Sequence, residues 1–258
     1  MNAPMLNLRG TWTIYRYEMA RFRRTLWQSL VTPILTTVLY FIVFGSAIGA
    51  RIGDINTVDY GAFIVPGLIL LTVFTQSLNN ASFAIYMPRF SGTIYEILSA
   101  PVSTAELVLA YVGAAATKSV LLGLIILLTA RLFIDLDISH PAWMLVYLIL
   151  VAFAFSLAGF IIGIVAASFE ALQFIPMLVV MPLTFLGGVF YSIDMLPATW
   201  QTVSLFNPLV YIVSGFRYFF FGTGDVSVWV SLAALGGFIG LALAIISWIV
   251  RTGYRLKS

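Results

Sequence analysis

The chain has 258 residues, of which 61% are apolar and only 9% are charged. Soluble domains carry about 25% charged residues, so this composition excludes an ordinary soluble protein and indicates an integral membrane protein. The net charge of +3 is small, and its cations flank apolar stretches, so nucleic acid is not expected as a partner. The absence of cysteine excludes disulfides and thiolate metal sites.

The first predicted element is a basic amphipathic helix over residues 9–26. Five apolar residues recur at spacings of three and four, which stacks them on one face: Trp12, Tyr15, Met19, Phe22 and Leu26. Arg16 and Arg23 flank this face, and a helix of this kind lies along the lipid headgroups with its aromatic side down. It is either an anchor that fixes orientation or a lever that touches a cytoplasmic partner. The apolar stretch that follows exceeds a signal-peptide core of roughly 7–15 residues, so we expect the N-terminus to be retained.

Six apolar stretches are long enough for helices of about 20 residues that cross a bilayer. The expected spans are residues 27–49, 60–82, 107–131, 142–168, 172–192 and 227–250. The expected fold is therefore all-α, with one transmembrane domain over residues 1–258. In the fifth span, Pro176, Pro182 and the following Gly187 and Gly188 predict a bend.

A short helix is expected within residues 89–101, in the loop between the second and third spans. It can begin at Ser91 or Gly92, and Pro101 ends it because the residue before a proline is disfavoured in helical conformation. Composition alone would favour an ordinary interfacial connector here.

The third span has a predicted cap and one unusual charge. Ser103 or Thr104 can cap its N-terminus, where Glu106 is favourable. Lys118 lies well inside the span, where a charge is costly and often functional, so contact with cargo is one interpretation. The other is that its amino group extends to the cytoplasmic interface.

Between the fifth and sixth predicted spans lies an apolar stretch that is unlike a simple span. Pro197 and Pro208 interrupt it, and it contains the polar Gln201 and Asn207. Broken backbone at membrane depth is tolerated where protein or a water-filled cavity satisfies its polar groups. Residues 194–217 are therefore expected to be a re-entrant helical hairpin on the outer side.

Charge predicts the orientation. With six crossings, one side collects nine of the 13 lysines and arginines: Arg9, Arg16, Arg21, Arg23, Arg24, Arg89, Arg251, Arg255 and Lys257. The other side has three: Arg51, Arg131 and Arg217. Because cytoplasmic loops carry the excess of positive charge, both termini are expected in the cytoplasm. Seven crossings would place the basic C-terminus outside.

Two motifs resemble a known family. One is the order Arg89, Gly92, Thr93, Glu96, Leu98, Pro101 and Val102, which is similar to the intracellular coupling helix of type 2 ATP-binding-cassette (ABC) exporter permeases. The other is GGVFYSIDMLP followed by FNPLVYIVSGFRY, which resembles the C-terminal signature of that family. The resemblance covers essentially the whole chain, which looks most like the bacterial branch containing the nodulation-factor exporter permease.

The resemblance implies a homodimeric permease in which each copy engages one separate ATPase subunit, in the bacterial inner membrane and among its lipids. The implied ATPase contacts are Arg89, Gly92, Thr93, Ile94, Glu96, Ile97, Leu98 and Pro101. In this scheme Arg89 and Glu96 make charged contacts, while the apolar residues fill a slot. The N-terminal helix would make a second contact through Trp12, Tyr15, Arg16, Phe22 and Arg23.

The same resemblance implies that the hairpin forms an outer gate over a path between the two copies. Its candidate residues are Phe190, Tyr191, Trp200, Phe206, Asn207, Tyr211 and Phe216. Aromatic faces contact apolar tails and sugar rings, which would suit a lipid-like or glycan-bearing cargo or a hydrophobic drug. Simple anchoring at the interface would use the same residues.

The chain has no visible catalytic or metal-binding machinery. Only Lys118 and Lys257 are lysines, neither follows a glycine, and no GxxxxGK[ST] phosphate loop exists, so ATP and Mg²⁺ are expected on the partner subunit. No HExxH or GxSxG pattern supports a membrane enzyme acting on lipids. An ion-coupled secondary transporter is the other alternative, but it would normally show acids deep in a span or an inverted repeat.

Overall fold

The computed structural model describes residues 7–48, 55 and 58–254, and its elements are helices. They are α1 (Leu8–Arg24), α2 (Leu26–Tyr40), η1 (Phe41–Ile48), α4 (Tyr60–Phe90), α5 (Ile94–Ser99), α6 (Thr104–Ala130), α7 (Pro141–Val165), α8 (Phe169–Ile175), η2 (Pro176–Val180), α9 (Met181–Phe185), η3 (Ile193–Met195), α10 (Ala198–Leu205), α11 (Pro208–Phe221) and α12 (Val228–Thr252). The predicted class, an all-α integral membrane protein, is confirmed.

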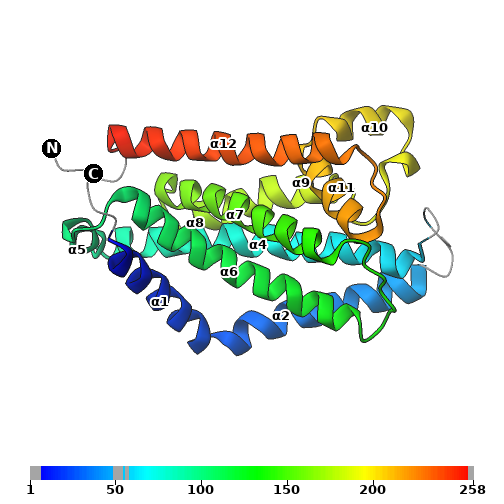
Figure 1. Cartoon of the computed structure of the whole chain (residues 1–258), viewed down its shortest axis with the longest axis horizontal. Helices are drawn as coiled ribbons and strands as arrows, with labels where there is room; N and C mark the ends of the chain where they lie inside the picture. The colour runs from blue at the N-terminus through cyan, green and yellow to red at the C-terminus, as the bar shows by residue number, and fades with distance from the viewer. Residues whose placement is uncertain (1–6, 49–54, 56–57, 255–258) are drawn as a thin grey trace.

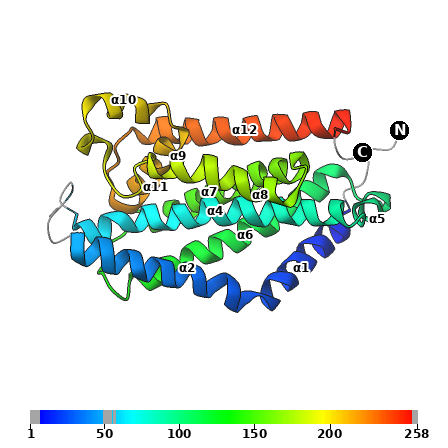
Figure 2. The same cartoon turned by 180° about the vertical axis from the view of Figure 1, so that it is seen from behind.

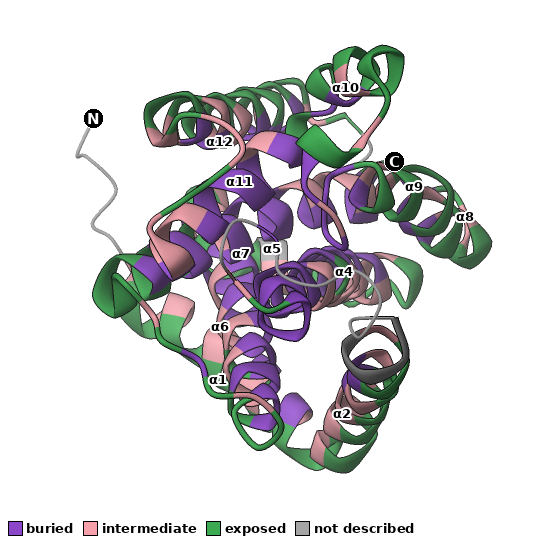
Figure 3. Cartoon of the chain, turned by 90° about the vertical axis from the view of Figure 1, so that its right-hand side faces the viewer, coloured by how far each residue is buried: buried purple, intermediate pink, exposed green. Residues whose placement is uncertain are grey.

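The centre of the bundle is α4, which packs along both α6 and α7 (Figures 1 and 2). Buried residues gather where α4, α6, α7 and α11 meet, whereas the outer sides of α2, α8 and α12 are exposed (Figure 3). The exposed residues on these outer sides are largely aliphatic or aromatic. In a bilayer such surfaces face lipid or another transmembrane helix, so exposure here does not mean contact with water.

Glycines let α7 approach α4 closely. A Cβ atom added to Gly159 would lie 2.5 Å from the carbonyl oxygen of Leu78, and Gly163 meets the backbone of Ser82 in the same way. Small residues of this kind allow the close backbone contact on which helix association in membranes depends. By contrast, a Cβ atom on Gly113 of α6 would meet open space.

Five described helices are long and apolar enough to cross a membrane: Leu26–Phe44, Tyr60–Phe90, Thr104–Ala130, Pro141–Val165 and Val228–Thr252. The helical stretch Phe169–Phe185 corresponds to the predicted fifth span and is shorter. It contains the π-helical η2 that begins at Pro176, and it ends well before the expected boundary at residue 192. The predicted boundary fails because Gly188, at φ +78°, lies in a turn outside the helix.

The two ends of the bundle carry different elements. One end holds α5 together with the start of α1 and the end of α12, and we call it the α5 end (Figure 1). The opposite end holds α10, α11 and the start of α12, and we call it the hairpin end (Figure 1). The helices α10 and α11 meet at 93°, a geometry found in both broken spans and re-entrant loops. Their common position at one end favours the re-entrant interpretation.

Candidate functional site

At the α5 end, the predicted coupling segment is only partly helical. Arg89 belongs to the last turn of α4, and Gly92 makes the following turn with φ +78°. The helix α5 then begins at Ile94 and ends at Ser99, because Ala100 is extended before Pro101. The 89–101 segment is thus a helix end, a turn, a helix of six residues and an extended exit.

The residues of α5 do not all face outward. Ile94 is 3% exposed and packs in the same apolar cluster as Leu107 and Tyr111 of α6, and Ile97 packs against this cluster. Ile94 is thus already covered by this chain, and its predicted place in a slot of a partner stays a prediction. The side chain of Leu98 lies outside the described residues.

Three exposed residues with large or charged side chains stand out in this segment, Phe90, Tyr95 and Glu96, and we call them the α5 surface. Phe90 is 76% exposed, Tyr95 is 57% exposed, and Glu96 is also exposed. Sequence reasoning named Glu96 but missed the two aromatic residues. Their position in a predicted loop could have indicated them, because aromatic residues there are not explained by the apolar face of a helix.

Arg89 ties this segment to α7. Its guanidinium donates hydrogen bonds to the carbonyl oxygens of Gly163 and Ile164, at 2.9 and 2.6 Å. These carbonyls lie at the C-terminal end of α7, where the helix dipole favours a cation. These bonds of Arg89 lie inside the chain, and its predicted charged contact with an ATPase stays a prediction.

The loop after α5 is tied to the start of α1. The side chain of Asn7 donates to the carbonyl oxygen of Pro101 at 2.9 Å and also caps α1 at Gly10. The backbone N–H of Asn7 donates to the carboxylate of Glu106. Ser103 and Glu106 form the capping box of α6, so one carboxylate joins the beginnings of two helices.

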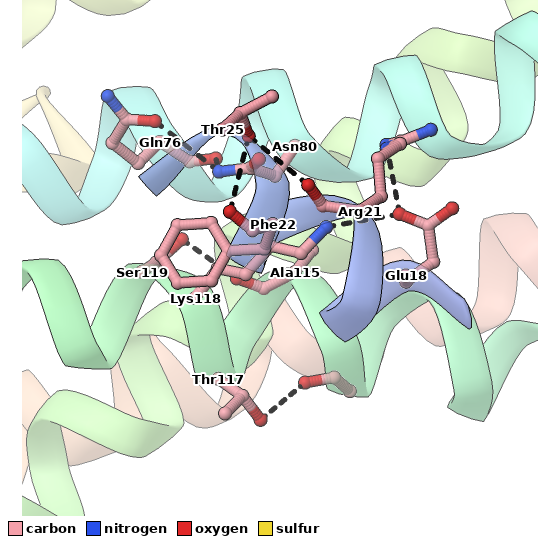
Figure 4. A network of polar contacts seen from close by, with 11 residues as sticks. Glu18, Arg21, Phe22, Thr25, Gln76, Asn80, Ala115, Thr117, Lys118 and Ser119 are labelled. Carbon is pink, nitrogen blue, oxygen red and sulfur yellow. Dashed lines mark hydrogen bonds and ion pairs between the residues drawn. The ribbon is translucent and has the colours of Figure 1, made fainter. Parts of the chain in front are cut away.

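Further along, α1 is fixed to α6 by a buried ion pair. The amino group of Lys118 lies 3.0 Å from the carboxylate of Glu18, and both residues are about 2% exposed. Arg21 approaches the same carboxylate at 2.9 Å (Figure 4). Lys118 therefore points into the contact between the helices and does not extend to the interface. The sequence analysis did not identify Glu18 as a partner of Lys118. Glu18 could have been noticed as the single acid in a strongly basic segment.

The faces of α1 are rotated from the prediction. Glu18 and Phe22 are its buried residues and face α6, so the aromatic Phe22 does not lie on the headgroups. Tyr15 donates to Thr117 of α6 at 3.2 Å, and Trp12 stacks on Tyr15. Among the other predicted contact residues, Trp12, Arg16 and Arg23 are exposed. The periodicity located a helix correctly but did not identify its partner.

At the hairpin end, the predicted gate residues separate into two groups. Phe190 and Phe216 are buried, whereas Trp200 and Phe206 are exposed and Tyr191 is half-buried. The ring of Phe190 contacts three other rings, those of Tyr40, Phe44 and Phe185, at centroid distances of 5.5, 5.1 and 5.5 Å. Phe190 thus joins the first helical span to α9, while Phe216 belongs to the interior.

Two of the predicted gate residues hold the hairpin backbone. Asn207 caps α11 by accepting from the N–H of Leu209, and it donates to the carbonyl oxygen of Leu183 at 2.6 Å. Tyr211 donates to the carbonyl oxygen of Leu205 at 2.7 Å across the bend. Their polar atoms are thus used to maintain the sharp turn between α10 and α11. Burial raises the pKa of the Tyr191 hydroxyl above its usual value.

Arg217 links several parts of the hairpin end. It pairs with Asp225 at 2.8 Å, donates to the carbonyl oxygen of Gly188 at 2.7 Å, and lies 4.0 Å from the ring centre of Phe63. Ser192 donates to Asp225 at 2.5 Å. Sequence reasoning counted Arg217 only as a loop charge, although it is the one charge between Asp194 and Asp225.

Comparison with known proteins gives the family. A family described as "ABC-2 type transporter" matches residues 9–221. The chain belongs to this ABC-2 family. The inner membrane transport permease YadH of Escherichia coli K12 is 39% identical over 247 residues, which covers 95% of this chain and 96% of the relative. Nodulation protein J of Rhizobium meliloti strain 1021 is 25% identical over 228 residues, covering 86% and 85%.

Family membership decides several of the expectations. As an ABC-2 permease the chain is a transport subunit and a multi-pass protein of the inner membrane. Membership also implies association with an ABC ATPase subunit. The α5 surface is then the candidate site for contact with the ATPase, and the hairpin end is the candidate site for contact with cargo.

Proposed function

We propose that this chain is the permease subunit of an ATP-driven exporter. Two copies form the transport path, and each engages one ATPase subunit that binds ATP and Mg²⁺. The cargo is amphipathic, either lipid-like or glycan-bearing, or is a hydrophobic drug, and it leaves the cytoplasm or the inner leaflet. The α5 end faces the cytoplasm, in keeping with the distribution of positive charge.

The observation that carries this proposal is the contrast within the coupling segment. Phe90, Tyr95 and Glu96 are exposed, while the base of the same segment is fixed to α7 by Arg89. Aromatic residues are enriched at protein interfaces, and their exposure here suits docking of a soluble partner. A force on this surface passes into α4 and α7, which form the centre of the bundle.

The hairpin end supports a role as the outer gate. Phe190 contacts rings from α2, η1 and α9, so a shift of the first helical span or of α9 would alter its packing. The outer faces of α2 and of Phe169–Phe185 are rich in exposed apolar residues, which suits contact with a second copy. Motion at the α5 end could in this way reach a gate at the opposite end.

An ion-coupled secondary transporter is less well supported. Such a carrier needs a buried acid that gains and loses a proton or ion. Glu18 is a buried acid, but both Lys118 and Arg21 already pair with its carboxylate, which favours a structural role.

Charge reversal on the α5 surface tests the proposal. Glu96→Arg should weaken co-purification with the ATPase, and lower transport, by about tenfold or more, because a charge of the wrong sign at an interface is strongly unfavourable. Ile97→Pro should uncouple ATP hydrolysis from transport, because proline breaks the short helix. Asp137→Arg, the same type of reversal at an exposed residue of the hairpin end, is the control and should leave both unchanged. Export that is unaltered in Glu96→Arg and Ile97→Pro would refute the coupling role.

A further inference from the structure

A groove opens on the lateral surface at the hairpin end, between α7, α11 and α12. Its volume is about 370 Å³, within the range of roughly 300–1,000 Å³ typical of ligand pockets. Its lining is almost entirely aromatic or aliphatic, with residues such as Trp143, Leu150, Trp229 and Leu232. Several of these residues are themselves exposed, so the groove is open from the side.

The groove has a polar end and an apolar end. His140 lies at its mouth just before α7, and Leu150 lies nine residues beyond Pro141, which is about 14 Å along the helix. This length is close to half of a hydrocarbon core of about 30 Å, which is one leaflet. Trp143 and Trp229 lie in the first turns of their helices, and tryptophan at that position marks the headgroup level.

The floor of the groove is held by fixed contacts. Tyr147 is buried, and its hydroxyl donates to the carbonyl oxygen of Ile212 at 3.3 Å. Two backbone bonds tie the approach to α7 onto the end of α11: Ser139 N–H to Phe220 at 2.9 Å, and His140 N–H to Phe219 at 3.1 Å. The groove is therefore formed before any ligand enters, which lowers the entropic cost of binding.

The chemistry of the walls selects for an apolar chain. Of the described residues that line the groove, none is a lysine, arginine, aspartate or glutamate. Arg217, the cation of α11, is buried against Asp225 and is not available to a headgroup. The polar atoms at the mouth include those of His140 and Tyr218, whose rings lie nearly parallel with centroids 6.1 Å apart. They suit the ester region of a lipid.

We propose that this groove binds one acyl chain of a phospholipid from the leaflet at the hairpin end. The ester lies at His140 and Tyr218, the chain runs past Tyr147, and its end lies near Leu150. The open lateral side, the length of one leaflet and the lack of charged residues in the lining all match this occupant. Because the groove contacts α11, a bound chain also supports the hairpin from the side.

A photoreactive lipid tests the proposal. The full chain is reconstituted in phosphatidylcholine vesicles that contain phosphatidylcholine with a diazirine near the end of one acyl chain. After irradiation, adducts are mapped by mass spectrometry. Labelling at Leu150 should exceed labelling at Leu243, an α12 residue of similar exposure outside the groove, by about fivefold. Equal labelling of the two positions would overturn the proposal.

Variants that fill the groove make the test specific. Val146→Trp and Leu232→Trp introduce a large ring from opposite walls, and each should lower the Leu150 adduct about fivefold while leaving the Leu243 adduct unchanged. Leu243→Trp is the matched control and should change neither the fold nor the Leu150 adduct. If either groove variant purifies normally and keeps full labelling at Leu150, the site is not the groove. Photoadducts that join Leu150 to a second copy of the chain would assign this face to a protein contact and would also overturn the proposal.

Discussion

Glu18 and Lys118 hold α1 against α6 through a contact from which water is excluded. Burying a single charge carries a large desolvation penalty, which the opposite charge of the partner offsets. Arg21 adds a second cation to the same carboxylate. The pair thereby fixes the angle at which the first helix leaves the bundle. It lies between the tether at Asn7 and the bend near Thr25, where α1 gives way to α2.

The two halves of this pair should respond differently to neutralisation. Glu18→Gln leaves the Lys118 ammonium buried without its acid, and loss of one partner of a buried pair costs about 3–5 kcal/mol. Lys118→Met leaves Glu18 with Arg21, so its effect should be clearly smaller. Thermal unfolding in detergent measures both, with Arg16→Gln on the exposed side of α1 as the control. An equal or larger effect of Lys118→Met would show that Arg21 does not compensate the charge of Glu18.

Lys118→Met also separates structure from cargo contact. If Lys118 acts only through Glu18, export should fall no further than the loss of folded protein explains. Abolished export with normal expression, thermal stability and ATPase binding would instead assign Lys118 to the cargo path. This residue could be predicted as unusual from sequence, because one lysine interrupts an apolar run. Its partner could not, because Glu18 is distant in sequence.

At the scale of elements, the packing of α7 on α4 depends on two glycines that bring the backbones together. Gly159→Ala would place a methyl group about 2.5 Å from the Leu78 carbonyl, so the helices must separate and stability should fall by about 1–3 kcal/mol. Gly113→Ala is the matched control on α6, where the space is open and higher helix propensity should stabilise by up to about 1 kcal/mol. Thermal unfolding should move in opposite directions for these variants. A stabilising Gly159→Ala would disprove the close contact.

Sequence periodicity and length located the long helices well, because a bilayer requires about 20 apolar residues to cross it. The same patterns did not predict which neighbouring element each apolar helix face packs against. Ile94 and Phe22 are apolar and looked available, yet both are covered by this chain. The fifth helical stretch was predicted too long because apolar residues continue past Phe185 into a turn that Gly188 makes. Composition alone does not distinguish a buried turn from a helix.

For the whole molecule, the placement of α5 and the hairpin at opposite ends predicts which side of the membrane each occupies (Figure 1). The chain has no cysteine, so single cysteines can be introduced as reporters without background. Thr223→Cys, in an exposed turn after α11, should react with a membrane-impermeant maleimide in intact cells. Ser99→Cys, at the end of α5, should react only after the membrane is opened. The reverse pattern would invert the proposed orientation.

The α5 surface is the proposed docking site of the ATPase. The most direct measurement places a photoreactive amino acid at Tyr95, the exposed aromatic residue of α5, and irradiates cells that export normally. Docking of the ATPase on the α5 surface should give a cross-link to a subunit that carries a GxxxxGK[ST] phosphate loop. The same photoreactive residue at Thr223, at the hairpin end, should give no such product. Absence of the ATPase cross-link at Tyr95, or its presence only at Thr223, would show that the ATPase does not dock on the α5 surface.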